Sequence, residues 1–125
     1  MPNWQPNWNN VLWNWGAADA AISALRSAAG VLDGTAGERI GVARDAQVEW
    51  RGLHRERFDG ELTQVLNRAR DLASECRTAA DRIASASRRA YEEQRHRERE
   101  RERWRREKED EDRRRREEEE RRRRR

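Results

Sequence analysis

The sequence predicts an all-α protein: an antiparallel helical hairpin that pairs into a four-helix bundle and continues into a long charged helical C-terminal extension. Two stretches carry apolar residues at alternating three- and four-residue steps, which is the spacing of one face of a helix. A short glycine-containing break separates these stretches. Charged residues make up 43% of the chain, against about 25% in an average protein, and more than half of them lie in residues 92–125.

The first segment, residues 1–15, is a leader rich in Trp and Asn. It contains a near repeat, Pro2-Asn3-Trp4-Gln5 followed by Pro6-Asn7-Trp8-Asn9. The two prolines oppose helix formation in the first half of the leader, and Asn9 or Asn10 is suited to cap a helix that begins there. Two roles stay open. The leader is either a strap that lays its indoles over the helical bundle or a docking surface, because Trp is enriched at binding hot spots.

Residues 16–48 are expected to form the first helix. Its apolar face is marked by seven residues, which are Trp15, Ala18, Ile22, Leu25, Ala29, Leu32 and Ala36. Gly34, Gly37 and Gly41 weaken the pattern, since each interior Gly destabilises a helix by roughly 1 kcal/mol relative to Ala. Apolar residues resume at Ile40, Ala43 and Val48, so the spacing predicts one continuous but weakened helix.

Residues 49–52 interrupt the apolar spacing and are interpreted as the turn, in which Gly52 can adopt the left-handed conformation that ends a helix. Residues 53–91 form the second predicted helix. Its main apolar stripe repeats without a miss through Phe58, Leu62, Val65, Ala69, Leu72, Cys76, Ala79, Ile83, Ala86 and Ala90. A second stripe of Leu66, Ala73 and Ala80 lies beside the first. The combined face is wider than contact with one other helix requires.

The width of this face implies a protein partner. Alanine removes little surface from water, and the large apolar side chains, worth about 1.5–3 kcal/mol each when fully buried, are few. A lone hairpin of this size is therefore marginal against its chain entropy. Pairing with a second hairpin, either another copy or a different protein, covers the second stripe. The expected interface residues are Ile22, Leu25 and Leu32 of the first helix and Leu62, Val65, Leu66, Leu72 and Ile83 of the second.

Residues 92–125 form a charged tract in which Trp104 is the only large apolar residue. The acids at 109–112 and 117–120 each stand four residues before an Arg, an arrangement that stabilises a helix by about 0.2–0.5 kcal/mol per pair. The tract is expected to continue the second helix as a solvated extension that has no core and frays at its end. A disordered tail is the alternative.

The sequence disfavours several classes of function. It has no glycine-rich phosphate loop, no G-x-S-x-G elbow and no H-E-x-x-H motif, so an enzyme is not expected. Cys76 is the only cysteine, and His54 and His96 are far apart, so neither a metal nor another cofactor is expected. Acids interleave with the Arg residues and oppose nucleic-acid binding, which leaves RNA binding by the tail as the least favoured alternative. Neither a membrane-spanning run nor an ordinary signal peptide is found.

The turn carries a resemblance to a known family. Trp50-Arg51-Gly52 lies between two predicted helices of similar length, and Phe58 follows eight residues after the Trp. In these features residues 10–91 resemble the WXG family of small helical hairpins that type VII secretion systems export. The resemblance implies a homo- or heterodimeric four-helix bundle and, through the export route, contact with a secretion ATPase.

The resemblance also implies a secretion signal after the second helix, a Tyr followed four residues later by an acid. Tyr91 stands near that position, but the residue four positions on is Arg95. This departure leaves open whether the chain or its partner supplies the signal.

The sequence therefore predicts a non-enzymatic interaction protein of type VII secretion, either a secreted dimer or the small partner of a larger secreted substrate. Under this hypothesis the chain is exported by a non-classical route, without a signal peptide, and is cytoplasmic before export. The alternative is a cytoplasmic coiled-coil adaptor unrelated to secretion, in which Trp50-Arg51-Gly52 is coincidental.

Overall fold

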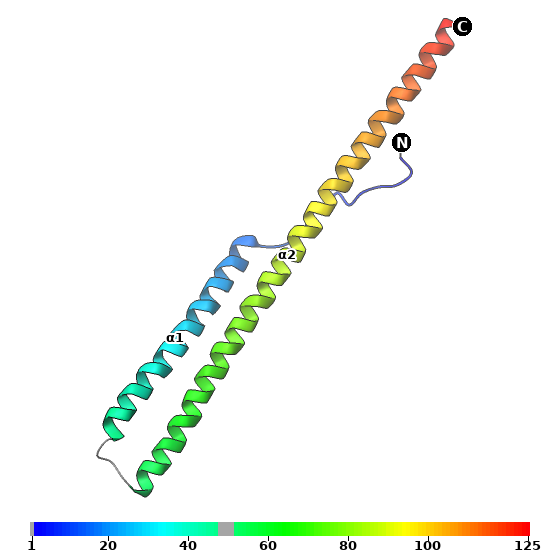
Figure 1. Ribbon diagram of the computed structural model, residues 1–125. Helices are drawn as coiled ribbons and strands as arrows, with labels where there is room; N and C mark the ends of the chain where they lie inside the picture. Colours follow the sequence, from blue (N-terminus) through cyan, green and yellow to red (C-terminus); the bar gives the residue numbers. More distant parts are fainter. Residues whose placement is uncertain (1, 48–51) are drawn as a thin grey trace. The chain divides into compact units, whose positions relative to one another are not determined.

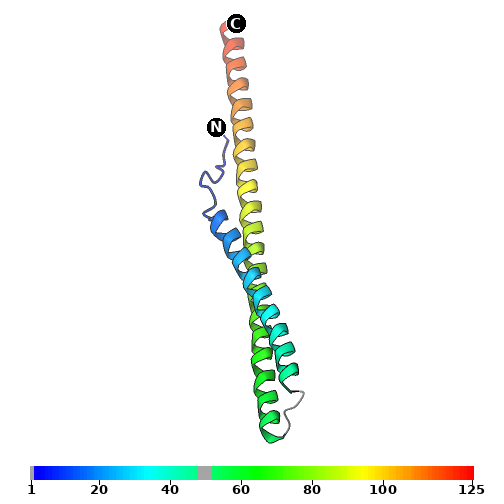
Figure 2. The same cartoon turned by 90° about the vertical axis from the view of Figure 1, so that its left-hand side faces the viewer.

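A computed structural model describes residues 2–47 and 52–125. These residues form two helices, α1 (Trp15–Gln47) and α2 (Leu53–Arg124), and no strand occurs in the two described ranges. α1 lies beside the first part of α2 and runs in the opposite direction, as both Figure 1 and Figure 2 show. The predicted all-α fold with two helices packed against each other is confirmed.

The chain divides into two units. The hairpin unit, Asn14–Ala86, contains α1 and the first part of α2. The leader–tail unit contains the N-terminal residues up to Trp13 together with Ser87–Arg125. The charged tract belongs to α2 and is helical up to Arg124. The leader and the charged tract, two ends of the sequence, therefore share one unit.

α1 begins after Asn14, which is its N-cap. Its side-chain Oδ1 accepts a hydrogen bond from the Ala17 backbone N–H at 2.9 Å, and its carbonyl oxygen accepts one from the Ala18 N–H at 3.0 Å. A side-chain acceptor at this position satisfies one of the free N–H groups at the start of a helix. The expectation that Asn9 or Asn10 caps this helix is wrong, because both residues lie in the non-helical leader.

The seam between α1 and α2 is built mainly from alanine. Its buried residues are Ala18, Ala29, Ala36 and Ala43 of α1 and Leu66, Ala73 and Ala80 of α2. Most of them are seven residues apart, which is the repeat of paired helices. The contacts made by Ala36 and Ala43 help to hold α1 in one piece through its glycines, as the sequence predicts. Small side chains allow the backbones to approach closely but bury little apolar area.

Gly52 stands at the start of α2. Its φ of 109° lies in the left-handed region, and its carbonyl oxygen accepts a hydrogen bond from the Glu56 backbone N–H at 3.2 Å. The left-handed conformation expected from the sequence is therefore present, but Gly52 precedes the second helix instead of ending the first. Trp50 and Arg51, the other members of the predicted turn motif, lie outside the described residues.

Replacing Gly52 with Ala is expected to lower the free energy of unfolding by about 1 kcal/mol or more, because an L side chain rarely adopts this φ. Gly60→Ala is the matched control. Gly60 lies inside α2 with open space around the position of an added Cβ, so the same change should raise stability by about 0.5–1 kcal/mol. Urea unfolding followed by circular dichroism measures both changes. Two shifts of the same sign would contradict this account of Gly52.

Candidate functional site

The two edges of the hairpin seam differ in chemistry. On one edge Arg26 lies 3.7 Å from Asp81, and Arg77 forms an ion pair with Asp33. Both pairs join α1 to α2, and all four side chains are largely exposed. Exposed pairs contribute little free energy, so these pairs serve mainly to match the two helices in register. We call this side of the seam the charged edge.

The opposite side, here called the open edge, is mainly apolar. It is formed by the residues that stand immediately before buried seam residues, which are Ala28, Thr35 and Val42 of α1 and Val65, Leu72 and Ala79 of α2. In an antiparallel pair, equivalent flanking positions of the two helices meet on the same edge. Val65 and Leu72 are each 48% exposed, and Val42 is 70% exposed. The larger apolar side chains of this edge are thus left without full cover.

Two hollows accompany the open edge. One lies between the helices and is lined by Leu32, Thr35, Ala36 and Arg39 of α1 and by Val65, Leu66 and Ala69 of α2. The other lies on α2 alone and is lined by Ser74, Glu75, Thr78, Ala79, Arg82 and Ile83. Protruding Val and Leu side chains next to such hollows are the knobs and holes with which one helix receives another. The open edge therefore combines exposed apolar side chains with neighbouring hollows.

The structure places the predicted interface residues in three environments. Leu66 is buried in the seam. The half-buried residues along the seam are Ile22, Leu25 and Leu32 of α1 and Leu62 and Ile83 of α2. Val65 and Leu72 are exposed on the open edge. Of the two predicted stripes of α2, the shorter one, with Leu66, Ala73 and Ala80, is the one buried against α1.

The remaining predicted site residues are Trp50, Phe58 and Tyr91. Phe58 is half-buried near the start of α2, and Trp50 lies outside the described residues. Tyr91 belongs to the leader–tail unit and is exposed. Of the predicted interface residues, Val65 and Leu72 are thus the two that the hairpin leaves exposed.

The leader contacts the charged part of α2, whereas the strap expected from the sequence was to cover the helical bundle. The leader lies along α2 in the opposite direction to the helix. The Trp13 indole N–H donates to Ser87 Oγ at 3.1 Å, and the Val11 backbone N–H donates to Gln94 Oε1 at 2.8 Å. Further along α2, Trp104 forms a hydrogen bond with Trp4, near the start of the leader. The leader is thus a strap on the charged part of α2.

Trp104 anchors the first residues of this strap. It is only 9% exposed, and its indole N–H donates to the Trp4 carbonyl oxygen at 3.0 Å. The Trp8 ring meets the Trp104 ring edge-on, with centroids 5.3 Å apart. The Trp4 indole N–H donates to Glu107 at 2.6 Å, and the Arg103 guanidinium lies 4.3 Å from the Trp4 ring centroid. The expectation that the charged tract has no core is wrong here, because the leader supplies one.

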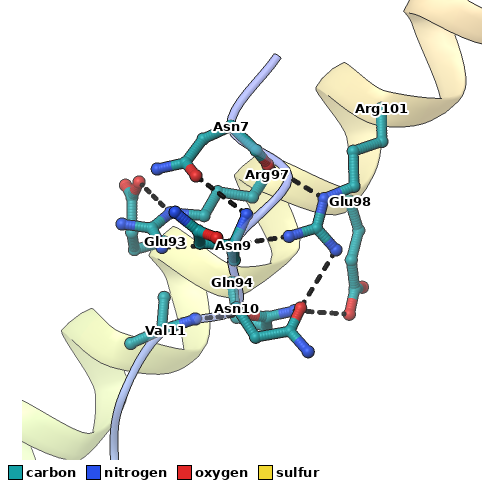
Figure 3. Close-up of polar contacts among 9 residues, drawn as sticks. All are labelled: Asn7, Asn9, Asn10, Val11, Glu93, Gln94, Arg97, Glu98 and Arg101. Atoms are coloured by element: carbon teal, nitrogen blue, oxygen red, sulfur yellow. Dashed lines mark hydrogen bonds and ion pairs between the residues drawn. The ribbon is translucent and has the colours of Figure 1, made fainter.

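Arginine side chains hold the middle of the strap by its backbone (Figure 3). Arg101 donates to the carbonyl oxygens of Asn7 at 3.0 Å and Asn9 at 2.7 Å, and to Asn10 Oδ1 at 3.0 Å. Arg97 donates a further bond to the Asn9 carbonyl oxygen at 3.2 Å. Because the leader has no regular secondary structure, its carbonyl groups need such donors. The fixed fork of a guanidinium suits several acceptors at once.

One signal in the sequence could have located this strap site. Ser87, Gln94 and Arg101 continue the seven-residue series of Leu66, Ala73 and Ala80 along α2. Polar residues thus take the helical positions that alanines occupy earlier in α2, and Trp104 lies one turn after the last of them. This change indicates a polar contact in place of an apolar seam.

The last residues of α2 are exposed and strongly charged. Arg124 pairs with Glu120 four residues before it, as expected from the sequence. Arg113 and Arg115 instead pair with Asp110 and Asp112, which stand three residues before them. Both spacings bring side chains together on a helix surface, so part of the expected ion-pair support is present.

Within residues 2–47 and 52–125, no group of three or more His, Cys, Asp or Glu side chains is placed to hold a metal ion. In the same two ranges, neither helix contains a stretch that is both long and apolar enough to cross a membrane. Comparison of the chain with protein-family models, with curated proteins and with solved structures gave no match.

Proposed function

We propose that this chain is a non-enzymatic interaction protein whose open edge binds a second helical hairpin and completes a four-helix bundle. The observation that carries the proposal is the partial exposure of Val65, Leu72 and Val42 in a row beside an alanine seam. Full burial of a Val or Leu side chain stabilises a complex by about 1.5–3 kcal/mol. Because these three side chains are partly exposed, covering each of them would add a substantial part of that free energy. The seam between α1 and α2 supplies little such burial by itself.

The charged edge supports the choice of the open edge as the binding side. Arg26–Asp81 and Asp33–Arg77 line the charged edge, and burying these ions against a partner would require their desolvation. The open edge has mainly apolar side chains to desolvate. A partner hairpin therefore gains most by docking on the open edge.

As a narrower proposal, the partner hairpin and this chain belong to a type VII secretion system, and a secretion ATPase handles the pair during export. The left-handed φ of Gly52 supports this, since it stands at the glycine of Trp50-Arg51-Gly52 and directly before the second helix. The exposure of Tyr91 on α2 leaves it accessible to an export machinery. Because Arg95 occupies the position of the acid, we propose that the partner supplies the export signal.

Leu72→Asp is expected to abolish binding of the partner hairpin, because a carboxylate would be buried without a counter-ion in the interface. Asn67→Asp is the matched control. Asn67 is exposed, lies on α2 away from the open edge and receives the same carboxylate. Tagged wild-type and variant chains, expressed in the native host, should differ in the small helical protein that co-purifies with them. Equal recovery with Leu72→Asp and wild type would contradict the proposal.

The export proposal has its own measurement. The wild-type chain should be found in the culture medium of its host, and deletion of the type VII ATPase should retain it in the cells. Leu72→Asp should also be retained, because a chain without its partner would lack the signal. Secretion of the Leu72→Asp variant at the wild-type level would show that the partner does not supply the export signal.

A further inference from the structure

We propose that residues 87–108 of α2, here called the strap site, bind an extended segment of another protein that carries an acidic residue where the leader carries Asn10. The leader is the intramolecular occupant of the strap site and leaves when the other segment binds. The strap site lies within the leader–tail unit and does not include the open edge, so this proposal is independent of the proposed pairing with a hairpin.

The strap site holds an extended chain. Its contacts come from five side chains on one face of α2, which are Ser87, Gln94, Arg97, Arg101 and Trp104. From Ser87 to Trp104 the helix advances about 25 Å, at 1.5 Å per residue. The leader covers this distance between Trp4 and Trp13, at about 3 Å per residue, which is close to the reach of a fully extended chain.

Most of these contacts go to the backbone of the leader. Trp104, Arg97 and Arg101 donate to carbonyl oxygens, and Gln94 accepts a hydrogen bond from a backbone N–H. Every residue carries a carbonyl group, and every residue other than proline carries an N–H. Another extended segment can therefore form the same hydrogen bonds.

Arg101 is the charged centre of the strap site (Figure 3). It donates to three acceptors of the leader, all of them neutral, and it forms no ion pair within residues 2–47 and 52–125. One of these acceptors, Asn10 Oδ1, also receives a hydrogen bond from Gln94 Nε2 at 3.1 Å. A carboxylate in the place of this amide would accept both bonds and balance the charge of Arg101. Charge-assisted hydrogen bonds of this kind are stronger than neutral ones.

The neighbouring acids leave this attraction in place. Glu93 pairs with Arg97 at 3.0 Å, and Glu98 pairs with Arg95 at 4.0 Å. The glutamine amide that donates to the leader also donates to Glu98, at 3.2 Å. Both acids thus have a cation of their own, and Arg101 is the cation that remains for an incoming carboxylate.

The leader also shows which side chains the strap site accepts beside the acid. Trp8, two residues before Asn10, meets the Trp104 ring edge-on with centroids 5.3 Å apart. Trp4, four residues before Trp8, has its ring centroid 4.3 Å from the Arg103 guanidinium. A matching segment therefore carries two aromatic residues four positions apart, followed two positions later by an acid.

The middle of the leader is exposed, so exchange can begin there. Trp8 is 46% exposed, and Asn7, Asn9 and Asn10 are exposed as well. Segments with few buried apolar contacts open locally at low free energy. Its covalent tether nevertheless keeps the leader beside the strap site at an effective concentration on the order of millimolar. A competing segment must therefore bind more tightly than the leader does, and the acid supplies this advantage.

Peptide binding to the full chain tests the proposal. Trp4→Ala weakens the tethered leader, because the indole that donates to Glu107 is lost, and it leaves α2 unchanged. A fluorescent peptide of residues 2–13 should then bind in trans, with fluorescence anisotropy giving its dissociation constant. The same peptide with Asn10→Asp should bind about fivefold more tightly at low salt and lose this advantage at high salt, since an exposed charge pair is screened. A peptide with Asn3→Asp is the matched control, because Asn3 is exposed in the leader, and it should bind like the native peptide.

Substitutions in α2 locate the effect. In a chain that also carries Arg101→Gln, the Asn10→Asp peptide should bind no more tightly than the native peptide. Arg99→Gln is the control, because Arg99 is exposed on another face of α2, and the fivefold difference should remain. An advantage that survives Arg101→Gln, or that the Asn3→Asp peptide shares, would overturn the pairing of the acid with Arg101.

Displacement is measured on the isotope-labelled wild-type chain. Saturating Asn10→Asp peptide should move the indole N–H signal of Trp4 in the NMR spectrum, because the hydrogen bond to Glu107 is lost when the leader leaves. Peptide that binds without moving this signal would lie elsewhere on the chain and would overturn the exchange. Failure of the Asn10→Asp peptide to bind the Trp4→Ala chain at millimolar concentration would overturn the strap site as a site for another protein. Neither result would affect hairpin binding by the open edge, which the Leu72→Asp experiment tests.

Discussion

Ala29→Leu should lower the free energy of unfolding of the hairpin unit by about 1–3 kcal/mol, because Ala29 is fully buried in the seam and its site has no room for three more carbons. The larger side chain would force the helices apart over several turns. The two helix backbones can approach closely only because each residue of the alanine seam is small. A Leu at one position would therefore also break the neighbouring contacts between α1 and α2.

Ala20→Leu provides the control for this prediction. Ala20 lies in the same helix, nine residues earlier, and is exposed. Since Ala and Leu are both good helix formers, this change should alter stability by less than about 0.5 kcal/mol. Denaturant unfolding followed by circular dichroism gives both values. If Ala29→Leu is as well tolerated as Ala20→Leu, the seam is not closely packed and the assignment of the open edge fails with it.

Trp104→Ala should release the leader from α2. The substitution removes a nearly buried indole, which costs about 3 kcal/mol or more in a packed site, and it removes the N–H bond to the Trp4 carbonyl oxygen. The loss is local to the leader–tail unit, so hydrogen exchange should rise in the leader and at Ser87–Lys108 while Leu53–Ala86 keeps its protection.

Trp104→Phe separates packing from hydrogen bonding at this site. The ring is retained but the donor to Trp4 is lost, so about 1 kcal/mol of local stability should disappear and the leader should stay bound. The indole N–H signals of Trp4 and Trp13 in an NMR spectrum report the two states. Unchanged signals in Trp104→Ala would show that Arg97 and Arg101 hold the leader without Trp104.

The sequence was sufficient to predict the two helices, but it did not predict which face of α2 packs against α1. Alternating apolar steps predicted a helix from residue 16, one residue after the start of α1 at Trp15, because burial on a helix leaves that spacing. The predicted end at residue 48 lies outside the described residues. Two stripes of equal period on α2 could not be ranked by period alone. The two stripes differ in side-chain size: Ala73 and Ala80 let α1 approach closely along the buried stripe, whereas the other stripe carries Val65 and Leu72, which stay exposed.

The leader could not be placed from its sequence because an irregular segment has no period to match. Its contacts are made largely by backbone carbonyls, which every residue carries, and by Arg side chains that also suit a solvated helix. Trp104 was the informative residue. A large apolar side chain alone among charges has no reason to be exposed, and here it marks the place where another segment packs.

The strap also sets an order of events during synthesis of the chain. Trp4 and its hydrogen-bond acceptor Glu107 are 103 residues apart, whereas Asp33 and Arg77 of the charged edge are 44 residues apart. The contact between the residues that are closer in sequence forms first, so the hairpin contacts can form while the charged tract is still being synthesised. At roughly 5–20 residues per second, the indoles of the leader wait about 5–20 s for Trp104 to be translated. During that interval the leader is a free Trp-rich segment that a chaperone or an early-binding partner can reach.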